Sequence, residues 1–483
     1  MEHSFLKRKE VMRIAIVGGG ASAVLILEAL NKRISRMRIK PSITIFEKNS
    51  SLGRGLAYRS NIKNLILNTS VDTMSVCEST PDDFRCWLQD NTTSETSITE
   101  IPRGLYGTYL EFKMEKCLRS LAEMGCDIRI YYAAVDKINL GDKYTLSFSE
   151  KEESYDVCIV ATGGDVTVPD NFDEEVSAKV LDIFDESKIS AIKKNSKVAI
   201  MGSGQSAVDA CLMLEQLNSQ CHYTLVSRNG VLPRVKSNLS ENKDINHVST
   251  INIINPHLPR LCHEIIGSIK WKMSGEGALN FSPASFRSME VDLKRALKTL
   301  PSWQRTMTAL TPFINELWSR HSEEEKHAFS QNWHRSMYFL RSAIMPESAS
   351  RFLDVYHSGR LGMIWGDYHL SANNNGFRLL AKNSSLSFDY VINTTGIKAI
   401  SHLKLLRDEI ENKKIAVNPQ GGLSVDFDSM KVLDGFGKPH EGLFSVGYPT
   451  QGSVLISNSV ELLRQKAVKI ARNITEKIYQ GIL

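Results

Sequence analysis

The order of apolar and polar positions predicts parallel strands that alternate with helices. Short and almost unbroken apolar runs, typical of strands buried on both faces of a sheet, recur along the chain. We expect strands at 14–17, 42–48, 155–164, 198–201, 222–228, 361–365, 377–383, 388–396 and 443–446. Apolar positions at helical spacing fill 110–121, 206–217 and 460–470 between them. This alternation indicates the α/β class.

A helical insertion interrupts the alternation between about 235 and 351. Four of the six tryptophans fall there, namely Trp271, Trp303, Trp318 and Trp333. Thr311-Pro312 resembles an N-cap with a first-turn proline, and Ser322 to Glu325 form a capping box. The helix that Ser322 opens carries Phe329, Trp333, Met337 and Leu340 on one face. We interpret this stripe as core packing, with a substrate surface as the alternative.

Three glycines follow the first strand directly. Gly18 permits a tight turn, and Gly20 lets the backbone approach a pyrophosphate; Ala23 takes the third small position of the G-x-G-x-x-G/A pattern. At the end of the next strand, Glu47 is placed to bind a ribose hydroxyl. The predicted contacts are Gly18, Gly19, Gly20, Ala21, Ser22, Glu47 and Lys48. A glycine turn without a ligand is the alternative.

The same design returns at 197–210, where Gly202, Gly204 and Ala207 repeat the pattern. The following strand ends in Ser227-Arg228 instead of an acid, which favours the 2′-phosphate of NADPH over NADH. Arg234 in the same loop is a candidate second charge, and a solvated surface arginine is the alternative for Arg228. The predicted contacts are Gly202, Ser203, Gly204, Gln205, Ser206, Ser227 and Arg228.

Other loops at strand ends are candidates for lining the same sites. The polar segment with Asn68 and Met74 suits a large flat cofactor, although an ordinary surface loop has the same composition. Small-residue turns follow three further strands. The additional predicted contacts are Asn68, Met74, Ala161, Thr162, Gly163, Thr395, Gly396 and Gly447. A closing strand–helix unit without ligand contact is the alternative for the last turns.

Composition narrows the functional classes. A chain of 483 residues is too long to form a single hydrophobic core, so we expect two or three domains. A composition of 42% hydrophobic and 23% charged residues is typical of globular proteins. The net charge of +5, without a basic run among aromatics, argues against nucleic acid. We expect no membrane-spanning helix and no secretory signal. The eight cysteines have no C-x-x-C or zinc spacing, so we expect reduced thiols, a cytoplasmic location, no metal and no dithiol redox pair.

The order of these motifs resembles the flavoproteins with two dinucleotide-binding domains. More closely, it resembles the bacterial FAD/NAD(P)-binding family that includes the HpyO-type proteins, which is related to N-hydroxylating flavin monooxygenases. The likeness rests on GGGASA, GRGLAY, LILNTSVDTMS, RGLYGTYL, ATGG, GSGQSAVDA, VSRNGVLPR and GYPTQG, and it is thin over the insertion. It implies FAD at the first glycine turn and a nicotinamide nucleotide at the second.

Two departures from related flavoproteins limit this resemblance. The F-x-G-x-x-x-H fingerprint of Baeyer–Villiger enzymes is absent, which disfavours that reaction. Tyr448-Pro449 follow Gly447 where many such flavoproteins have an Asp near the ribityl chain, so that contact must come from other groups.

The resemblance also sets the expected domains. Two Rossmann-like domains, for FAD and NAD(P), would be interleaved in sequence with the helical insertion. The expected segments are 1–165 and 386–483 for FAD, 166–240 and 351–385 for NAD(P), and 241–350 for the insertion. The repeated designs YDVCIVATGG and FDYVINTTG suggest paired crossings between the domains. We expect the C-terminal helix to pack on the FAD domain.

The expected function is an FAD- and NADPH-dependent oxidoreductase. A monooxygenase that uses O2 to hydroxylate a small molecule, with an amine nitrogen as one candidate atom, is the first hypothesis. An NADPH oxidase or reductase without oxygen insertion is the second. A redox-sensing flavoprotein without enzymatic activity is the third. The sequence identifies neither a catalytic side chain nor the substrate, and it leaves a homo-oligomer open.

Overall fold

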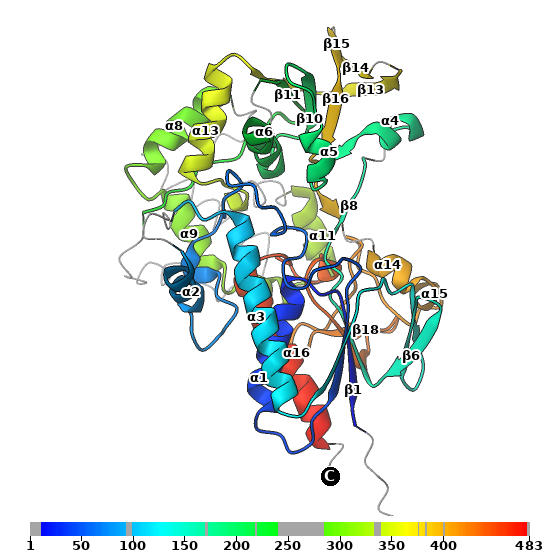
Figure 1. The fold of residues 1–483 in the computed structure, drawn as a ribbon. Coiled ribbons are helices and arrows are strands. Elements are labelled where there is room, and N and C mark those ends of the chain that lie inside the picture. The colour runs from blue at the N-terminus through cyan, green and yellow to red at the C-terminus, as the bar shows by residue number, and fades with distance from the viewer. Residues whose placement is uncertain are drawn as a thin grey trace, which may run out of the picture.

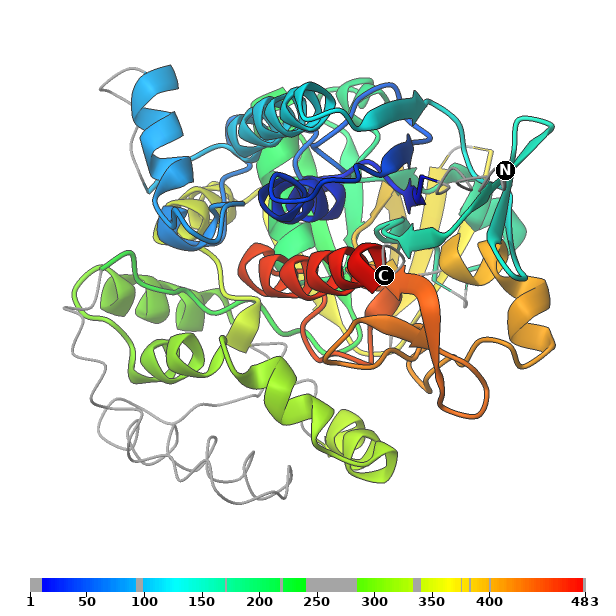
Figure 2. The ribbon, with the colours of Figure 1, turned by 90° about the horizontal axis from the view of Figure 1, so that it is seen from below.

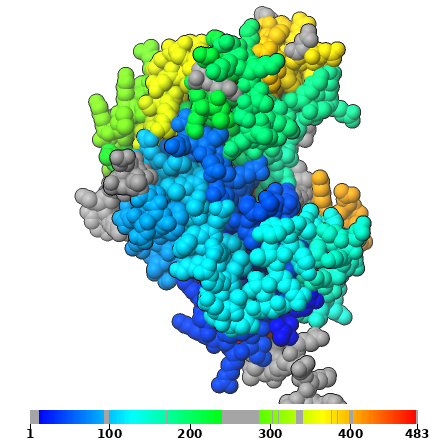
Figure 3. Space-filling model, in the orientation of Figure 1, coloured from blue at the N-terminus to red at the C-terminus, as the bar shows by residue number. Residues whose placement is uncertain are grey.

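Two largely parallel sheets organise the fold and lie one above the other in Figure 1. The computed structural model describes residues 11–92, 99–169, 172–217, 220–239, 285–332, 340–374, 376–381, 384–398 and 401–480. We call the lower sheet and its helices the first domain, and the upper sheet and its helices the second domain. Figure 3 shows the blue and cyan surface of the first domain continuing upward into the green and yellow surface of the second.

The first domain is built on a six-stranded sheet in the order β18-β19-β7-β1-β2-β3. The strands are β1 (Arg13–Val17), β2 (Ser42–Phe46), β3 (Asp127–Tyr131), β7 (Val157–Val160), β18 (Lys431–Leu433) and β19 (Pro439–Ser445). All neighbours are parallel except β18 and β19. Ile14 and Ile16 have no exposed surface, as expected for a strand covered on both faces.

Three long helices share the core of this sheet. They are α1 (Ala21–Ile34), α3 (Arg103–Glu123) and α16 (Val460–Gln480). α1 packs against both α3 and α16, and Figure 2 shows α1 beside the red C-terminal helix. Leu110 and Met114 of α3 and Ala467 and Ile470 of α16 are buried, so the expected apolar faces are the packed faces. The C-terminal helix therefore lies on the first domain.

Smaller elements complete the first domain. Strands β4 (Lys137–Leu140), β5 (Tyr144–Phe148) and β6 (Lys151–Tyr155) form an antiparallel sheet. The short helices are η1 (Val71–Thr73), α2 (Asp83–Asn91), α14 (Ser401–Leu405), α15 (Arg407–Glu411) and η3 (Tyr448–Thr450).

The second domain has a five-stranded parallel sheet in the order β12-β11-β10-β16-β9. The strands are β9 (Leu181–Asp182), β10 (Lys197–Met201), β11 (His222–Ser227), β12 (Leu361–Trp365) and β16 (Tyr390–Asn393). Its helices are α4 (Glu174–Lys179), α5 (Glu186–Ser190), α6 (Gln205–Leu217), α8 (Phe286–Ala296) and α13 (Pro346–His357). An antiparallel sheet of β13 (Tyr368–Asn373), β14 (Gly376–Ala381) and β15 (Ser384–Phe388) packs its apolar side chains on one face of the parallel sheet, against β10, β11 and β16.

The two similar sequence designs hold equivalent places in the two sheets. Asp156, ahead of β7, accepts a hydrogen bond from the backbone N–H of Arg13 at 2.8 Å. Asp389, ahead of β16, accepts one from the N–H of Lys197 at 2.7 Å. Each Asp thus fixes the start of its own strand against the start of the strand that precedes a glycine turn.

The chain crosses between the domains twice, and the crossings are paired. β8 (Asp165–Val166) leaves the first domain and pairs antiparallel with β17 (Ile397–Lys398), which returns to it. We expected the closing segment of the first domain to begin at 386. β16 instead pairs with β10 in the second sheet, so the return crossing follows Asn393. The Asp389 contact with Lys197 is the physical reason that this strand belongs to the second domain.

The described part of the insertion bridges the two domains. α8 packs on α13, which packs on α6 of the second domain. α9 (Ser302–Leu310), α10 (Ile314–Ser319) and α11 (Glu323–Asn332) pack instead on the segment before α16. Trp318 Nε1 donates to the carbonyl of Gly452 at 2.7 Å, and Asn315 exchanges two hydrogen bonds with the backbone of Ile456. Phe329 and Leu340 lie in this core, while Trp333 and Met337 lie outside the described residues.

One of the two expected helix starts in the insertion is confirmed. The hydroxyl of Ser322 accepts from the N–H of Glu325 at 3.2 Å, and the Glu325 carboxylate accepts from the N–H of Ser322 at 3.0 Å, which is the expected capping box. The expected start at Thr311-Pro312 is wrong. Thr311 is the C-cap of α9, and α10 begins at Ile314, because Thr311 N continues the α9 hydrogen bonds by donating to Met307 O.

Candidate functional site

Only glycine can occupy the first position of the first glycine turn. Gly18 has φ +108°, and a Cβ there would lie 2.3 Å from the carbonyl oxygen of Ala161. The neighbouring backbones are fixed, since Gly18 N donates to Phe46 O and Ala161 N donates to Val17 O, both at 2.8 Å. The turn is thus locked between β2 and the end of β7.

Gly20 leaves a space beside the start of α1. A Cβ on Gly20 would lie 3.2 Å from Gly55 Cα, so two glycines face each other across the turn. α1 has Gly20 as its N-cap, with no side-chain cap and no acid in its first turn. The first N–H groups of the helix, at Ala21 and Ser22, are therefore available to an anion in a favourable dipole. This is the geometry that a pyrophosphate requires.

Glu47 is buried, and both of its carboxylate oxygens have partners. Oε2 accepts from Gly19 N at 2.8 Å, while Oε1 accepts from Asn49 N at 2.9 Å and Asn49 Nδ2 at 2.6 Å. Glu47 is only 8% exposed, whereas Lys48 next to it is exposed. The acid therefore holds the glycine turn in shape, and its contact with a ribose stays a prediction.

The C-terminal strand returns to the same turn. Gly447 has φ +82°, and a Cβ there would lie 3.1 Å from Ser22 Oγ at the start of α1. Thr162, after β7, has a buried Oγ1 without a hydrogen-bond partner among the described residues, and Gly163 faces open space. The ends of β1, β7 and β19 thus meet at one edge of the sheet, as in sites outside the carboxyl ends of parallel strands.

The loop with Asn68 and Met74 is partly buried, with Thr69, Ser70 and Asp72 exposed between them. Met74 is 3% exposed, and its carbonyl accepts from Tyr106 Oη at 2.8 Å. The carbonyl of Asn68 accepts from Lys236 Nζ, and the side-chain Oδ1 of Asn68 is buried without a partner among the described residues. Both ends of the loop are thus held against the protein, and contact of Asn68 and Met74 with a cofactor stays a prediction.

The second glycine turn repeats the first. Gly202 has φ +125°, and a Cβ there would lie 2.8 Å from Thr394 Oγ1, whereas a Cβ on Gly204 would meet open space. α6 begins at Gln205 with no acid in its first turn, and Gln205 Nε2 donates to the carbonyl of Ala343 at 2.9 Å. Ser206 is in that first turn. This helix start is again suited to an anion.

Near the end of β11, two serines belong to the glycine turn, whereas Arg228 lies on the surface. Ser203 Oγ lies 3.0 Å from Ser227 Oγ and 2.7 Å from the carbonyl oxygen of Val231, so both serines are engaged in the turn. Arg228 is exposed. Arg234 is not a second charge for this site, because its guanidinium forms an ion pair with Asp292 of α8, with 2.6 Å between Nε and Oδ2.

Thr395 and Gly396 lie in the return crossing. Thr395 donates from both N and Oγ1 to Asn393 Oδ1, at 3.0 Å and 2.7 Å, and is exposed. Gly396 has φ +121°, and a Cβ there would meet open space. The structure therefore places both residues between the domains, beside β8, and not in either glycine turn.

No sequence pattern predicts the group of cations at the domain junction. Burial, together with the smaller effect of the Arg341 charge, lowers the pKa of Lys236 to about 8. Burial lowers the pKa of Lys466 in α16 to about 7, again with Arg341 contributing. These residues are far apart in sequence and match no motif, so only the fold brings them together.

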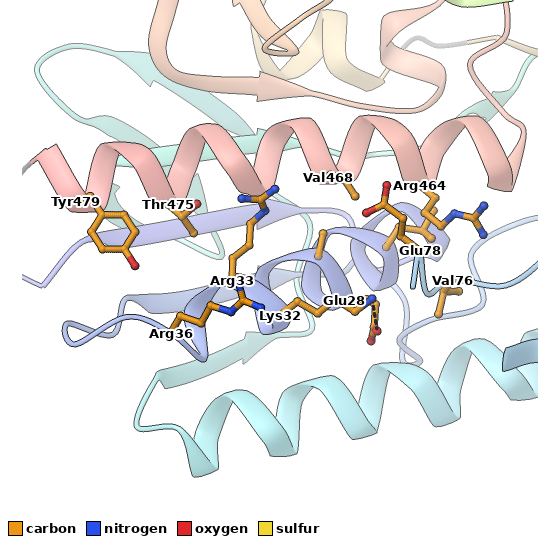
Figure 4. Close-up of a pocket in the computed structure, with 12 residues that line it drawn as sticks. Glu28, Lys32, Arg33, Arg36, Val76, Glu78, Arg464, Val468, Thr475 and Tyr479 are labelled. Atoms are coloured by element: carbon orange, nitrogen blue, oxygen red, sulfur yellow. Dashed lines mark ion pairs between the residues drawn. The ribbon is translucent and has the colours of Figure 1, made fainter. Parts of the chain in front are cut away.

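A groove of about 380 Å³ opens between α1 and α16, as Figure 4 shows. Lys32 and Arg33 from the last turn of α1 and Arg36 just after this helix line the groove together with Arg464 and Tyr479 of α16. The glycine turn lies at the opposite end of α1. The groove is thus separate from the two candidate nucleotide sites.

Two further observations concern the described residues alone. They contain no group of three or more acidic, histidine or cysteine side chains that could hold a metal, and no helix long and apolar enough to cross a membrane. Their seven cysteines are free thiols, while Cys262 lies outside them.

Two family models match the chain. Residues 15–165 match a model described as FAD-NAD(P)-binding, and residues 95–245 match a model described as L-lysine 6-monooxygenase/L-ornithine 5-monooxygenase. The expected resemblance to FAD/NAD(P)-binding proteins related to N-hydroxylating monooxygenases is thereby confirmed. A comparison with curated protein sequences gives no significant match.

Solved structures of similar fold include three amine or amino-acid monooxygenases. Ornithine hydroxylase from Pseudomonas aeruginosa has a TM-score of 0.60 at 14% identity, covering 98% of this chain and 100% of the other. L-lysine 6-monooxygenase from Pseudomonas syringae gives the same four values. A cadaverine monooxygenase from Erwinia amylovora, solved with FAD bound, has a TM-score of 0.58 at 11% identity, covering 97% and 95%. The fold with two dinucleotide-binding domains is thereby confirmed.

Proposed function

We propose that this protein is an FAD- and NADPH-dependent monooxygenase that hydroxylates the nitrogen of a small amine. The observation that carries the proposal is the match to the lysine/ornithine monooxygenase model in a chain with two glycine turns, one in each domain. The structural likeness to amine and amino-acid hydroxylases over nearly the whole chain supports it.

The residues present at the first turn fit FAD. Gly20 and Gly55 leave a cradle that a side chain would fill, and the start of α1 offers N–H groups to the pyrophosphate. Thr162 Oγ1 is a buried hydroxyl without a partner among the described residues, which a polar cofactor edge would satisfy. We assign Gly18, Gly19, Gly20, Ala21 and Ser22 to the pyrophosphate side of this site.

The second turn suits NADPH. Its pyrophosphate would lie at Gly202, Gly204 and the start of α6, where a side chain on Gly204 would meet open space. Arg228 is free of any ion pair among the described residues and is exposed at the strand end, so it is available to the 2′-phosphate. The absence of an acid there removes the group that would repel this phosphate.

FAD, when bound, supplies the redox chemistry: it takes a hydride from NADPH and transfers one atom of O2 to the amine. The balanced reaction is amine plus NADPH, H+ and O2 giving hydroxylamine, NADP+ and water. The protein's own task is to align two nucleotides and exclude water. Gly447 lies against Ser22 and covers the first site from the side of the C-terminal segment. The helices α9 to α11 pack on the residues between Gly447 and α16 and hold this segment in place.

The deciding experiment is NADPH consumption by the purified holoprotein with a panel of small amines, coupled to mass detection of the product. A gain of one oxygen in step with NADPH oxidation supports the proposal. Stoichiometric H2O2 release with every amine would indicate an oxidase instead. A flavoprotein that oxidises no NADPH would indicate a redox sensor.

Thiol chemistry supports a proposal for the cellular location. The described cysteines are free, and most are buried, as is typical of proteins in a reducing compartment. We therefore propose a cytoplasmic enzyme whose partners are a small amine and O2. Fractionation of cells that express the tagged chain tests the location.

A further inference from the structure

Two arginines in the groove between α1 and α16 have no acidic partner. Arg33 is half-buried and Arg36 is exposed, and neither guanidinium forms an ion pair among the described residues. Figure 4 shows the guanidinium group of Arg33 extending from α1 toward α16. The carbonyl end of a helix carries only about half a negative charge. The end of α1 therefore compensates less than one of these two cations.

The other two cations of the groove hold its wall in place. Lys32 Nζ donates to Cys77 Sγ at 3.0 Å and to Ser79 Oγ at 2.8 Å. Arg464 Nη1 donates to the carbonyl of Ser75 at 2.7 Å. One cation from each helix thus fixes the segment 75–79, which follows the loop with Asn68 and Met74. Lys32 and Arg464 shape the groove, and their charges add to its positive potential.

The two acids of the groove lie away from the unpaired arginines. Glu28 lies 3.8 Å from Lys113 Nζ and 4.0 Å from Lys32 Nζ, so its charge is already compensated. Glu78 is exposed, and Figure 4 places it beside Arg464. The end of the groove with the unpaired arginines is therefore positive, and it complements an anion.

The size and the walls of the groove fit a small molecule. Its volume of about 380 Å³ lies in the range of small-ligand sites, about 300–1,000 Å³. A stable protein partner would instead need roughly 800 Å² of surface on each side. Tyr479 of α16 is 48% exposed and lines the same end of the groove as the arginines, so its ring and hydroxyl can contact a ligand.

We propose that this groove binds a small oxyanion with at least two negative charges, held by Arg33 and Arg36 against Tyr479. A guanidinium group matches a carboxylate or a phosphate with two parallel hydrogen bonds, and two such groups balance two negative charges. Phosphorylated metabolites and di- or tricarboxylates share this chemistry. The groove is outside both glycine turns, so the proposal goes beyond the proposed monooxygenase reaction and does not depend on it.

The bound oxyanion is an effector that helps the protein to retain FAD. α1 begins at the first glycine turn, and α16 follows the segment in which Gly447 lies beside Ser22. The two helices pack on each other, and their separation would open the flavin site. An anion in contact with both helices opposes this separation, because a ligand that binds only the closed, folded state stabilises that state.

The test is calorimetric titration of the FAD-loaded protein with inorganic pyrophosphate and, separately, with citrate. NADP+ is present at saturation, so both glycine turns are occupied, and the ionic strength is held constant. We expect at least one of the two probes to bind with one-to-one stoichiometry, to raise Tm and to slow the release of FAD. Tighter binding of pyrophosphate identifies a phosphorylated ligand, and tighter binding of citrate identifies a carboxylate.

A variant that carries both Arg33→Gln and Arg36→Gln should bind the probe at least about ten-fold more weakly, the lower limit for one charged hydrogen bond. Arg33→Lys should retain part of the affinity, because it keeps the charge and loses the planar fork. Arg38→Gln is the matched control, since Arg38 is exposed and lies outside the lining of the groove. Circular dichroism and flavin content verify that each variant folds and holds FAD.

Several results would overturn the proposal. One is a wild type that binds neither probe, and another is a double variant that binds as tightly as wild type. An equal loss in Arg38→Gln would show that the anion is attracted only by the general positive charge of this surface. Binding that leaves the rate of FAD release unchanged would rule out the effector role.

Discussion

Arg103 of α3 binds Asp209 of α6 through two hydrogen bonds, Nη1 to Oδ2 at 2.7 Å and Nη2 to Oδ1 at 3.1 Å. The pair joins the first domain to the second, and the side chains are only 19% and 14% exposed. Arg103 Nε also donates to the carbonyl of Ile66 at 3.0 Å. A fork of this kind fixes the relative orientation of two helices better than a lysine would.

Arg103→Ala should therefore destabilise the protein by about 3 kcal/mol, because it leaves Asp209 mostly buried without its partner. Equilibrium urea unfolding measures the loss. Arg119→Ala is the control: its ion pair with Glu115 is exposed on the same helix and should cost less than about 0.5 kcal/mol. An equal effect of the two variants would contradict a special role for the domain contact.

The stability of the Arg103→Ala variant should depend on pH. Burial raises the pKa of Asp209, and Arg103, the charged group that faces it, opposes this rise. Without Arg103 the folded-state pKa rises further above the unfolded value, so the folded variant takes up a proton more readily. Its deficit relative to wild type should then be smallest in acid and grow as the pH rises through the raised pKa of Asp209. Urea midpoints between pH 4.5 and 8 test this, and a pH-independent deficit would refute it.

Gly20→Val should remove the flavin. The branched side chain would crowd Gly55, whose Cα lies 3.2 Å from the Cβ position, and would fill the space that a pyrophosphate needs. Wild type should be yellow with bound FAD, identified by release and chromatography, and the variant should be colourless. Gly362→Val is the control, because a Cβ at this exposed position of β12 meets no atom within 4 Å. A yellow Gly20→Val variant would contradict the site.

Arg228→Ala should separate NADPH from NADH. Loss of one charged hydrogen bond costs roughly 1.5–3 kcal/mol, which is about ten- to a hundred-fold in affinity. The KM for NADPH should rise by that factor, while the KM for NADH stays nearly unchanged, as steady-state kinetics with each nucleotide would show. Arg119→Ala again serves as the control. A wild type that prefers NADH, or a variant with equal losses, would show that Arg228 is only a surface residue.

The strand–turn–helix units were predictable because their causes are local. Each unit depends on features that follow one another directly in the sequence. These are an apolar run, a glycine that allows a positive φ (Gly18 or Gly202) and a helix start without acids. The paired crossings were also predictable from two similar sequence designs. The domain to which β16 belongs was not, because the bond from Lys197 to Asp389 joins residues that are far apart in sequence.

The same reasoning explains what was missed at the site. Arg234 had the right charge in the right loop, but its partner Asp292 comes from a helix of the insertion. No motif marks Lys236 in the sequence, since a single lysine in a polar segment is most often solvated. Its partly buried position depends on Asn68 and Ile344, and the fold alone supplies both neighbours.

Because the first domain is discontinuous in sequence, its two parts are synthesised at different times. β1, β2, β3 and β7 leave the ribosome early, but β19 completes the sheet beside β7 only near the end of translation. Until then the face of α1 that packs on α16 has no cover, and the glycine turn lacks Gly447 beside Ser22. The nascent chain must keep this half-sheet soluble while the whole second domain folds. We therefore expect the flavin to bind only after β19 and α16 have joined the first domain.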